Sequence, residues 1–256
     1  MRKSFFGNER TVVTSLFTNM TTVSDICRAS AKAASDGADA VAVQLDYLLP
    51  EQRTKENYRR IISSAPELPF MFIDYRSDKY YGQDDDARQK FLLETTECGA
   101  EIVDVMGDLY DPSPRELTFK PEAVERQRSL IREIHARGAK VVMSSHMREF
   151  LTADEIGSHL RAQKERGADL LKIVTLTDTE EQLCEAIRAD VRLHRTLGAP
   201  FIHLSNGKFS RLHRFLGLKL GLAVTFAAPV ETENMQPLIG QFKAVDENIR
   251  WHLPED

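Results

Sequence analysis

Short apolar segments alternate with longer amphipathic segments along the whole chain. Short apolar runs predict strands buried in a sheet, whereas apolar residues recurring three or four apart predict helices. We expect strands over residues 11–17, 40–47, 69–75, 102–109, 140–146, 167–176, 200–206 and 223–229. We expect helices over residues 23–35, 84–98, 121–137, 153–166, 179–197, 210–217 and 236–249, with one more after Pro50 and with Ser24 as a cap of the first.

A glycine–alanine pair stands just before five of these strands, at residues 37–38, 99–100, 138–139, 167–168 and 198–199. Glycine commonly follows the last turn of a helix because it adopts the left-handed conformation without steric cost. The recurrence therefore indicates a repeating strand–helix unit. Eight such units in 256 residues predict an α/β fold, the (β/α)8 or TIM barrel.

A doubly wound open sheet is the main alternative to the barrel. It would be favoured by a glycine-rich phosphate-binding loop after an early strand, and the sequence contains none. No linker or change of composition divides the chain, so we expect one barrel domain over residues 1–256.

Lys172 stands in the middle of the apolar segment 167–176. Burial disfavours the ammonium form, so the pKa of this lysine is expected to fall. A neutral amine in a dry pocket attacks carbonyl carbons and forms Schiff bases. The alternative is a lysine at a strand end that pairs with a carboxylate or reaches solvent.

Polar residues gather near the carboxyl ends of the expected strands, where barrels carry their functional sites. Those of inward parity are Gln44, Asp46, Asp74, Arg76, Asp104, Asp108, Ser144, His146, Lys172 and Asn206. Each one alone is explained by a helix cap or a surface position, but their convergence at one end of one barrel predicts an active site. No metal-ligand spacing is present, so we expect neither a metal nor another cofactor.

These residue types suggest a reaction. Lys172 would form an iminium with a ketone, and His146, on the adjacent strand, would take a proton from the neighbouring carbon or pass one to a leaving hydroxyl. Arginines would hold an anionic group of the substrate. The sequence thus favours a Schiff-base dehydratase or aldolase that acts on a small anionic keto acid.

Composition and charge narrow the class of partner. The chain is 42% hydrophobic and 29% charged, with a net charge of -5 and no basic stripe for nucleic acid. No apolar run approaches the roughly 18 residues of a membrane span, and residues 1–9 contain no signal-peptide core. Three scattered cysteines favour a reducing compartment. We expect a cytoplasmic protein without nucleic-acid or membrane partners.

The runs Val141-Val142-Met143-Ser144-Ser145-His146 and Gly167-Ala168-Asp169-Leu170-Leu171-Lys172-Ile173 resemble the histidine and lysine motifs of type I 3-dehydroquinate dehydratases. The resemblance covers nearly the whole chain. It implies that the lysine forms the Schiff base with 3-dehydroquinate and that the histidine serves as general base and acid in the loss of water to 3-dehydroshikimate. It also suggests a homodimer.

The same resemblance assigns substrate contacts. Arg211, in a Ser-Arg pair, would bind the substrate carboxylate, and Arg76 would contact the substrate from the third strand. Thr232 and Gln236 resemble the hydroxyl and amide of the lid loop. Asp46 is retained in the second strand, where Gln44 is the remaining candidate contact.

The chain departs from the family pattern at several of these positions. Ala42 and Gln44 stand where the family has a glutamate and an arginine, and Tyr80 stands where the family has a glutamate that supports the histidine. Two alternatives follow from these losses. The chain is either a Schiff-base lyase for a different small keto acid, or a barrel that binds a ligand and has lost turnover.

Overall fold

A computed structural model of the chain describes residues 3–231 and 236–254. Eight parallel strands form one sheet in the order β7-β6-β5-β4-β3-β2-β1-β8. The strands are β1 (Val12–Phe17), β2 (Ala40–Gln44), β3 (Phe70–Ile73), β4 (Ile102–Met106), β5 (Lys140–His146), β6 (Leu170–Leu176), β7 (Phe201–Asn206) and β8 (Val224–Ala227). The backbone N–H of Ala223 donates to the carbonyl of Phe201 at 2.9 Å, which links the two end strands.

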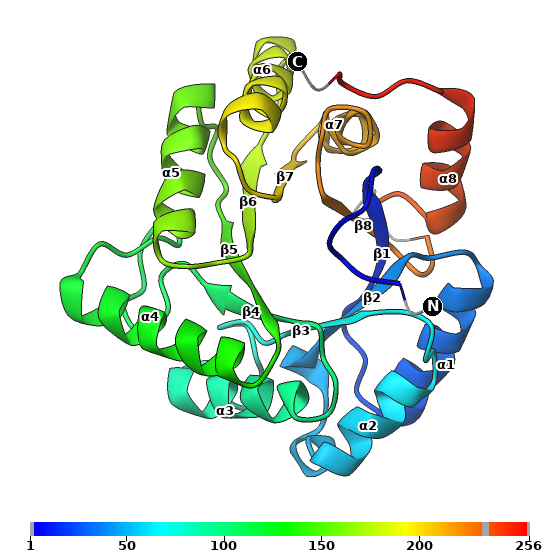
Figure 1. Cartoon of the computed structure of the whole chain (residues 1–256), viewed down its shortest axis with the longest axis vertical. Helices are drawn as coiled ribbons and strands as arrows, with labels where there is room; N and C mark the ends of the chain where they lie inside the picture. Colours follow the sequence, from blue (N-terminus) through cyan, green and yellow to red (C-terminus); the bar gives the residue numbers. More distant parts are fainter. Residues whose placement is uncertain (1–2, 232–235, 255–256) are drawn as a thin grey trace.

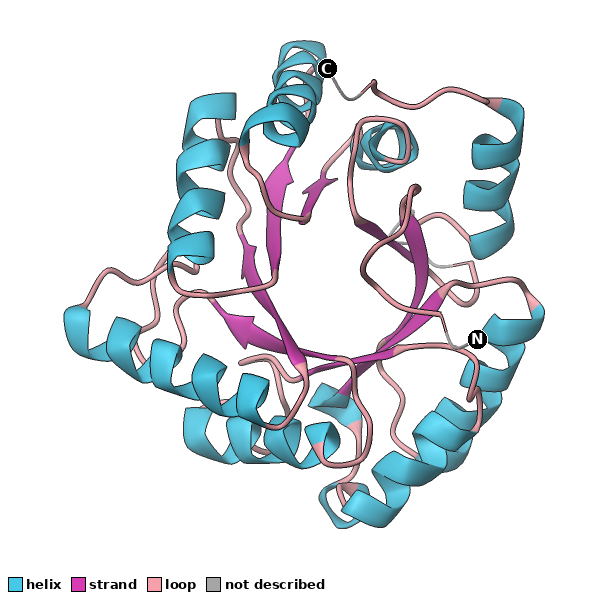
Figure 2. Ribbon diagram, in the orientation of Figure 1, coloured by secondary structure: helices cyan, strands magenta, loops and turns pink. Residues whose placement is uncertain are grey.

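Helices alternate with the strands and surround them (Figures 1 and 2). They are α1 (Val23–Ser35), α2 (Lys55–Ser63), α3 (Asp85–Thr96), α4 (Pro121–Ala136), α5 (Ala153–Glu165), α6 (Glu180–Thr196), α7 (Ser210–Gly217) and α8 (Ile239–Asn248). The nearly closed ring of strands inside a ring of helices confirms the predicted (β/α)8 barrel.

Local signals explain the boundaries of several helices. The five glycines that precede strands all have positive φ, for example 99° at Gly167, which confirms the expected helix stops. The expected cap of α1 at Ser24 is wrong. Thr22 is the cap, and its side chain accepts from the backbone N–H of Asp25.

β1, β5, β6 and β7 end at the expected residues, whereas β2, β3, β4 and β8 end two or three residues early. Residues 45–47 form a short 3-10 helix after β2, and β3 ends at Ile73, two residues before the expected end. The hydrophobic core includes buried aliphatic and aromatic side chains between the strands and the helices, such as Val41, Phe72 and Leu171. No helix in the part of the chain that the structure describes is long and apolar enough to cross a membrane.

Candidate active site

Lys172 and His146 lie on adjacent strands of the barrel. In the parallel register of β5 and β6, Ser144 pairs with Lys172 and His146 pairs with Val174. Side chains of like parity on neighbouring parallel strands lie on the same face of a sheet. The lysine and the histidine, predicted to act together, are thus close in space.

Lys172 is buried, with 5% of its surface exposed. Its Nζ donates a hydrogen bond to Tyr75 Oη at 2.8 Å and lies 5.0 Å from the centre of the Phe226 ring. Burial lowers the pKa of Lys172, and the charge of Arg214 acts in the same direction, against the opposing effect of Asp104. At a given pH, a larger fraction of Lys172 than of an exposed lysine is therefore in the neutral form that nucleophilic attack requires.

Tyr75 is the polar centre of the site. Its hydroxyl lies 3.1 Å from Asp104 Oδ2 and 3.3 Å from His146 Nε2, in addition to the contact with Lys172. Its ring meets the His146 ring edge to face at a centroid distance of 4.9 Å. Burial, and next the charge of Asp104, raises the pKa of Tyr75 well above its usual value, so the tyrosine keeps its proton.

Sequence reasoning missed Tyr75, because alternation along the third strand placed Asp74 on the inward row instead. That assignment is wrong: β2 and β3 pair Gln44 with Ile73, so the inward row of β3 is that of Ile73, and Tyr75 continues it past the end of the strand. Strand parity therefore points to Tyr75 once the register of β2 and β3 is known. Asp74 is buried beside Arg53, with 3.5 Å between Oδ2 and Nη1. Burial, with the nearby charge of Asp78, raises the pKa of Asp74 to about 9.

Glu116 orients the imidazole of His146. Its Oε2 accepts from the backbone N–H of His146 at 2.7 Å and lies 3.1 Å from Nδ1. A carboxylate there favours the tautomer with hydrogen on Nδ1, which leaves the lone pair of Nε2 available as a base. Burial, and next the charge of Lys172, lowers the pKa of His146, while Glu116 raises it. The imidazole is therefore neutral at neutral pH.

The hypothesis of a barrel without turnover rests on the loss of an acidic partner for His146. That premise is wrong, because His146 does contact a carboxylate. Tyr80 is 44% exposed, whereas the carboxylate that contacts His146 comes from Glu116, between β4 and α4. Glu116 has a φ of 45°, and its carbonyl accepts from Ser145 Oγ at 2.7 Å. A Cβ on Gly107 would lie 2.5 Å from that carbonyl oxygen, so the loop needs glycine there.

Asp104 completes the buried polar group around the lysine. Its Oδ1 accepts from Ser144 Oγ at 2.6 Å, and its Oδ2 accepts from Tyr75. Burial raises the pKa of Asp104, while the charge of Lys172 and the Ser144 hydrogen bond oppose that rise. The site thus combines an amine, an imidazole, a phenol and a carboxyl group within one network.

The other predicted contacts from the first strands occupy the ends of β2, β3 and β4. Gln44 Nε2 donates to Asp46 Oδ2 at 2.9 Å, and Asp46 Oδ1 accepts from the backbone N–H of Tyr75 at 3.1 Å. Arg76 forms a two-pronged ion pair with Asp108, at 3.2 and 3.1 Å. In this structure, therefore, Gln44 and Asp46 support the segment that carries Tyr75.

The three substrate contacts predicted near the chain's end lie in different surroundings. Arg211 lies over the ring of Phe215, 5.8 Å from its centre. Gln236 Nε2 donates to the carbonyl of Phe226 at 2.9 Å, so it lies beside the strand whose aromatic ring faces Lys172. Thr232 lies outside the described residues.

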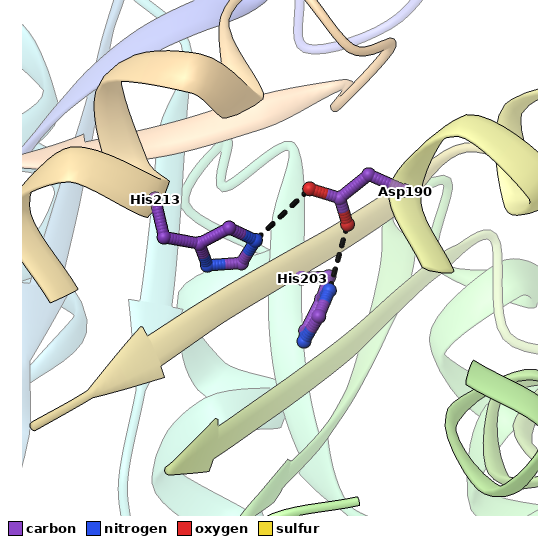
Figure 3. A group of neighbouring side chains, drawn as sticks. All are labelled: Asp190, His203 and His213. Carbon is purple, nitrogen blue, oxygen red and sulfur yellow. Dashed lines mark hydrogen bonds and ion pairs between the residues drawn. The ribbon is translucent and has the colours of Figure 1, made fainter. Parts of the chain in front are cut away.

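Only one group among the described residues has the geometry of a possible metal site. Asp190, His203 and His213 are fully buried, and their ligand atoms lie within 4.8 Å of one another (Figure 3). Asp190 Oδ1 is 2.7 Å from His203 Nδ1, and Oδ2 is 3.0 Å from His213 Nε2. The remaining ring nitrogens contact the hydroxyls of Thr175 and Ser205. Hydrogen bonds thus engage every ring nitrogen, and the group connects α6 and α7 to β7.

Replacement of Asp190 by alanine is expected to destabilise the barrel. It leaves two buried imidazole N–H groups without their acceptor, at roughly 1–3 kcal/mol for each. Chemical denaturation would measure the loss in the free energy of unfolding. Exposed Asp154→Ala is the matched control, and equal stability of the two variants would contradict the assigned role of the buried group.

The site lies at the carboxyl ends of the strands, where (β/α)8 enzymes carry their active sites. The chain matches the family model described as type I 3-dehydroquinase over residues 16–246. It therefore belongs to the type I 3-dehydroquinase family, as the sequence resemblance predicted.

Individual relatives agree with this assignment. The 3-dehydroquinate dehydratase of Klebsiella pneumoniae is 28% identical over 196 residues, which are 74% of each chain. The crystal structure of 3-dehydroquinate dehydratase from Geobacillus kaustophilus has a TM-score of 0.80 at 16% identity, covering 95% of this chain and 93% of that chain. The type I enzyme from Clostridium difficile has a TM-score of 0.79 at 19% identity, covering 95% and 94%. At such identities the structural likeness shows the fold.

Proposed function

We propose that the chain is a 3-dehydroquinate dehydratase, which removes water from 3-dehydroquinate to give 3-dehydroshikimate. One observation carries this proposal beyond family membership. Lys172 Nζ and His146 Nε2 approach the same hydroxyl, that of Tyr75, at 2.8 and 3.3 Å. A buried amine and a neutral imidazole are thus within reach of one small bound molecule, as Schiff-base dehydration requires.

Lys172 is the proposed nucleophile. Its free amine attacks the ketone carbon, and departure of one water molecule gives a protonated imine, the iminium. The iminium withdraws electrons from the adjacent carbon and makes its C–H bond more acidic. The lowered pKa of the buried amine favours the first step near neutral pH.

His146 is the proposed general base and acid. Its Nε2 takes the proton from the carbon next to the iminium, with Nδ1–H held by Glu116. The resulting enamine expels the hydroxyl on the next carbon, and the imidazolium protonates it to water. Hydrolysis of the remaining iminium then consumes the first water and restores the Lys172 amine, so the net change is the loss of one water.

The remaining polar residues are proposed to hold the substrate. Arg211 and Arg76 would contact its carboxylate and hydroxyls, and Thr232 and Gln236 would cover it from the segment after β8. Gln44 and Asp46 would complete the hydroxyl-binding side. We also infer that the protein forms a homodimer and acts in the cytoplasm. Size-exclusion chromatography with light scattering would test the dimer.

A second candidate is a Schiff-base lyase for a different small keto acid. Ala42 and Gln44 replace two polar groups expected from the family, and Tyr75 lies directly against the lysine. These features change the space and the partners available to substrate hydroxyls. Turnover of 3-dehydroquinate, followed by the ultraviolet absorbance of its conjugated product, is the deciding experiment. Turnover only of other keto acids would favour the second candidate.

Replacing Glu116 with glutamine is expected to lower kcat by about 10- to 100-fold. The amide keeps the shape but loses the charge that supports imidazolium, roughly 1.5–3 kcal/mol for a charge-assisted hydrogen bond. Because Glu116 raises the pKa of His146, its loss should move the acidic limb of the kcat/KM profile to lower pH. Steady-state rates across pH would measure both effects.

Tyr80→Phe is the matched control, since Tyr80 stands where the family pattern has the glutamate that supports the histidine. Its side chain is 44% exposed, so we expect an unchanged pH profile. A shifted pH profile in Tyr80→Phe, with an unchanged profile in Glu116→Gln, would contradict the assignment of Glu116 as the carboxylate that supports His146.

A further inference from the structure

Dehydration through a Schiff base moves protons at two different places in the site. Imine formation moves them between the lysine nitrogen and the ketone oxygen, which leaves as the first water, whereas loss of the second water moves them at carbon. His146 serves the second place. Its Nδ1–H is held by Glu116, so Nε2 of the neutral imidazole carries a lone pair and has no proton to give to the first departing oxygen. A separate proton donor is therefore required beside the nitrogen of Lys172.

Tyr75 supplies the hydroxyl at that nitrogen. Among the described residues, Tyr75 Oη is the only hydrogen-bond partner of Lys172 Nζ, at 2.8 Å. The phenolic O–H donates in turn to Asp104 Oδ2 at 3.1 Å. The two hydrogen bonds run in one direction, from the lysine nitrogen through the tyrosine oxygen to the carboxylate. Because a phenol accepts one proton while it donates another, this chain carries a proton between its ends without passing through a phenolate.

Asp104 is placed to hold the proton at the far end of this chain. Ser144 Oγ donates to its Oδ1 at 2.6 Å, which fixes the carboxyl group and leaves Oδ2 for Tyr75. Burial raises the pKa of Asp104, which favours uptake of a proton. Within residues 3–231 and 236–254, no carboxylate forms an ion pair with Lys172 directly. A proton that passes from the amine to Asp104 therefore travels through the tyrosine hydroxyl.

A second tyrosine shows that packing alone does not require such contacts. Tyr58, on α2, is fully buried, and its hydroxyl has no hydrogen-bond partner in the described part of the chain. The hydroxyl of Tyr75, in contrast, contacts three ionisable groups, those of Lys172, Asp104 and His146. The position of this hydroxyl indicates a chemical role.

We propose that Tyr75 is a catalytic residue that relays protons between Lys172 and Asp104 while the imine forms and while it is hydrolysed. This inference rests on the proposed Schiff-base function. In the first transfer, the lysine ammonium gives a proton to Tyr75, which passes its own proton to the Asp104 carboxylate. The result is a free amine, an intact phenol and a carboxylic acid. The nucleophile is thus generated by the same chain that later returns the proton.

The protons and electrons of the later steps balance. The amine of Lys172 forms a C–N bond to the ketone carbon, and one nitrogen proton moves through the Tyr75 hydroxyl to the ketone oxygen. The C–O bond then breaks, the nitrogen lone pair forms the C=N bond, and the departing oxygen takes the proton that Asp104 returns through Tyr75. The products are one water, an iminium cation and the Asp104 carboxylate. Hydrolysis reverses each transfer, and His146 stays neutral for the step at carbon.

The test measures imine formation alone, in the His146→Ala variant, in which the adduct with 3-dehydroquinate forms but dehydration is slow. Samples quenched into borohydride at successive times and read by intact-protein mass give the rate constant of adduct formation. Addition of Tyr75→Phe should lower this rate constant by about 10²-fold, within the usual range for a proton-transfer group. The concentration of 3-dehydroquinate that gives half of the final adduct should not change, because a relay accelerates formation and hydrolysis equally.

Two further variants in the same background complete the design. Asp104→Asn keeps the shape of the side chain, but its amide does not take up the proton, so it should slow adduct formation as Tyr75→Phe does. It also tests the relay if Tyr75→Phe does not fold. Tyr58→Phe is the matched control, since it removes the hydroxyl of a buried tyrosine without hydrogen-bond partners among the described residues, and it should change neither quantity.

The outcomes separate the relay from the function on which it rests. An unchanged rate constant in folded Tyr75→Phe overturns the relay alone. A slower rate with a matching rise in the half-maximal concentration also overturns it, because hydrolysis is then not slowed and Tyr75 only stabilises the adduct. An adduct in the wild type but none in His146→Ala overturns it by assigning the same protons to His146. Absence of any adduct in the wild type overturns the Schiff-base function and the relay together.

Discussion

Lys172→Ala is expected to abolish dehydration of 3-dehydroquinate, with a loss in kcat of more than about 10⁴-fold, as is usual when a covalent nucleophile is removed. No other amine among the described residues contacts Tyr75 Oη, so no neighbouring group can take over the attack. The fold should survive, because the mutation removes a desolvated amine from the barrel rather than a core aliphatic group. Steady-state rates and a thermal unfolding curve would measure the two effects.

Lys140→Ala is the matched control for this loss. Lys140 begins the neighbouring strand β5, but its side chain is 52% exposed and pairs with Asp169 on the surface. Its replacement should leave kcat within about twofold. A Lys172→Ala variant that retained the wild-type rate would remove the lysine from the mechanism and with it the Schiff base.

His146→Ala is expected to lower kcat by about 10²–10⁴-fold, the usual contribution of a general acid–base group. The physical reason is that its Nε2, with Nδ1 held by Glu116, is a neutral base that approaches the same Tyr75 hydroxyl as the lysine. The Schiff base itself should still form, because Lys172 remains. Trapping of the adduct in this variant, with little product, would distinguish the two roles.

His135→Ala is the matched control for the histidine. His135 lies on α4 and pairs with Asp169, and its side chain is 36% exposed. Its replacement should leave kcat unchanged. An unchanged rate in His146→Ala would contradict the assignment of the general base.

The architecture was readable from the sequence because its signals are local and repeated. Each glycine before a strand adopts the positive φ that ends a helix, and this does not depend on distant contacts. The strand ends were less predictable. The segment after Ile73 leaves the sheet because hydrogen bonds to Asp46 hold it, and such a contact between segments 29 residues apart leaves no periodic trace.

The sequence predicted only part of the site, because some of its groups lie outside the strands. Lys172 and His146 stand within strands, where register places them side by side. Tyr75 and Glu116 come from loops, and their positions depend on packing against Asp104, Gly107 and Ser145. A search by strand parity therefore finds the amine and the imidazole, whereas Tyr75 also requires the register of β3 and Glu116 the packing of its loop.

Borohydride trapping with 3-dehydroquinate, followed by peptide mass analysis, tests the central claim most directly. The account predicts one reduced adduct, located on the peptide that contains Lys172 and absent in Lys172→Ala. No adduct in a folded wild-type sample, or an adduct on a different lysine, would contradict it.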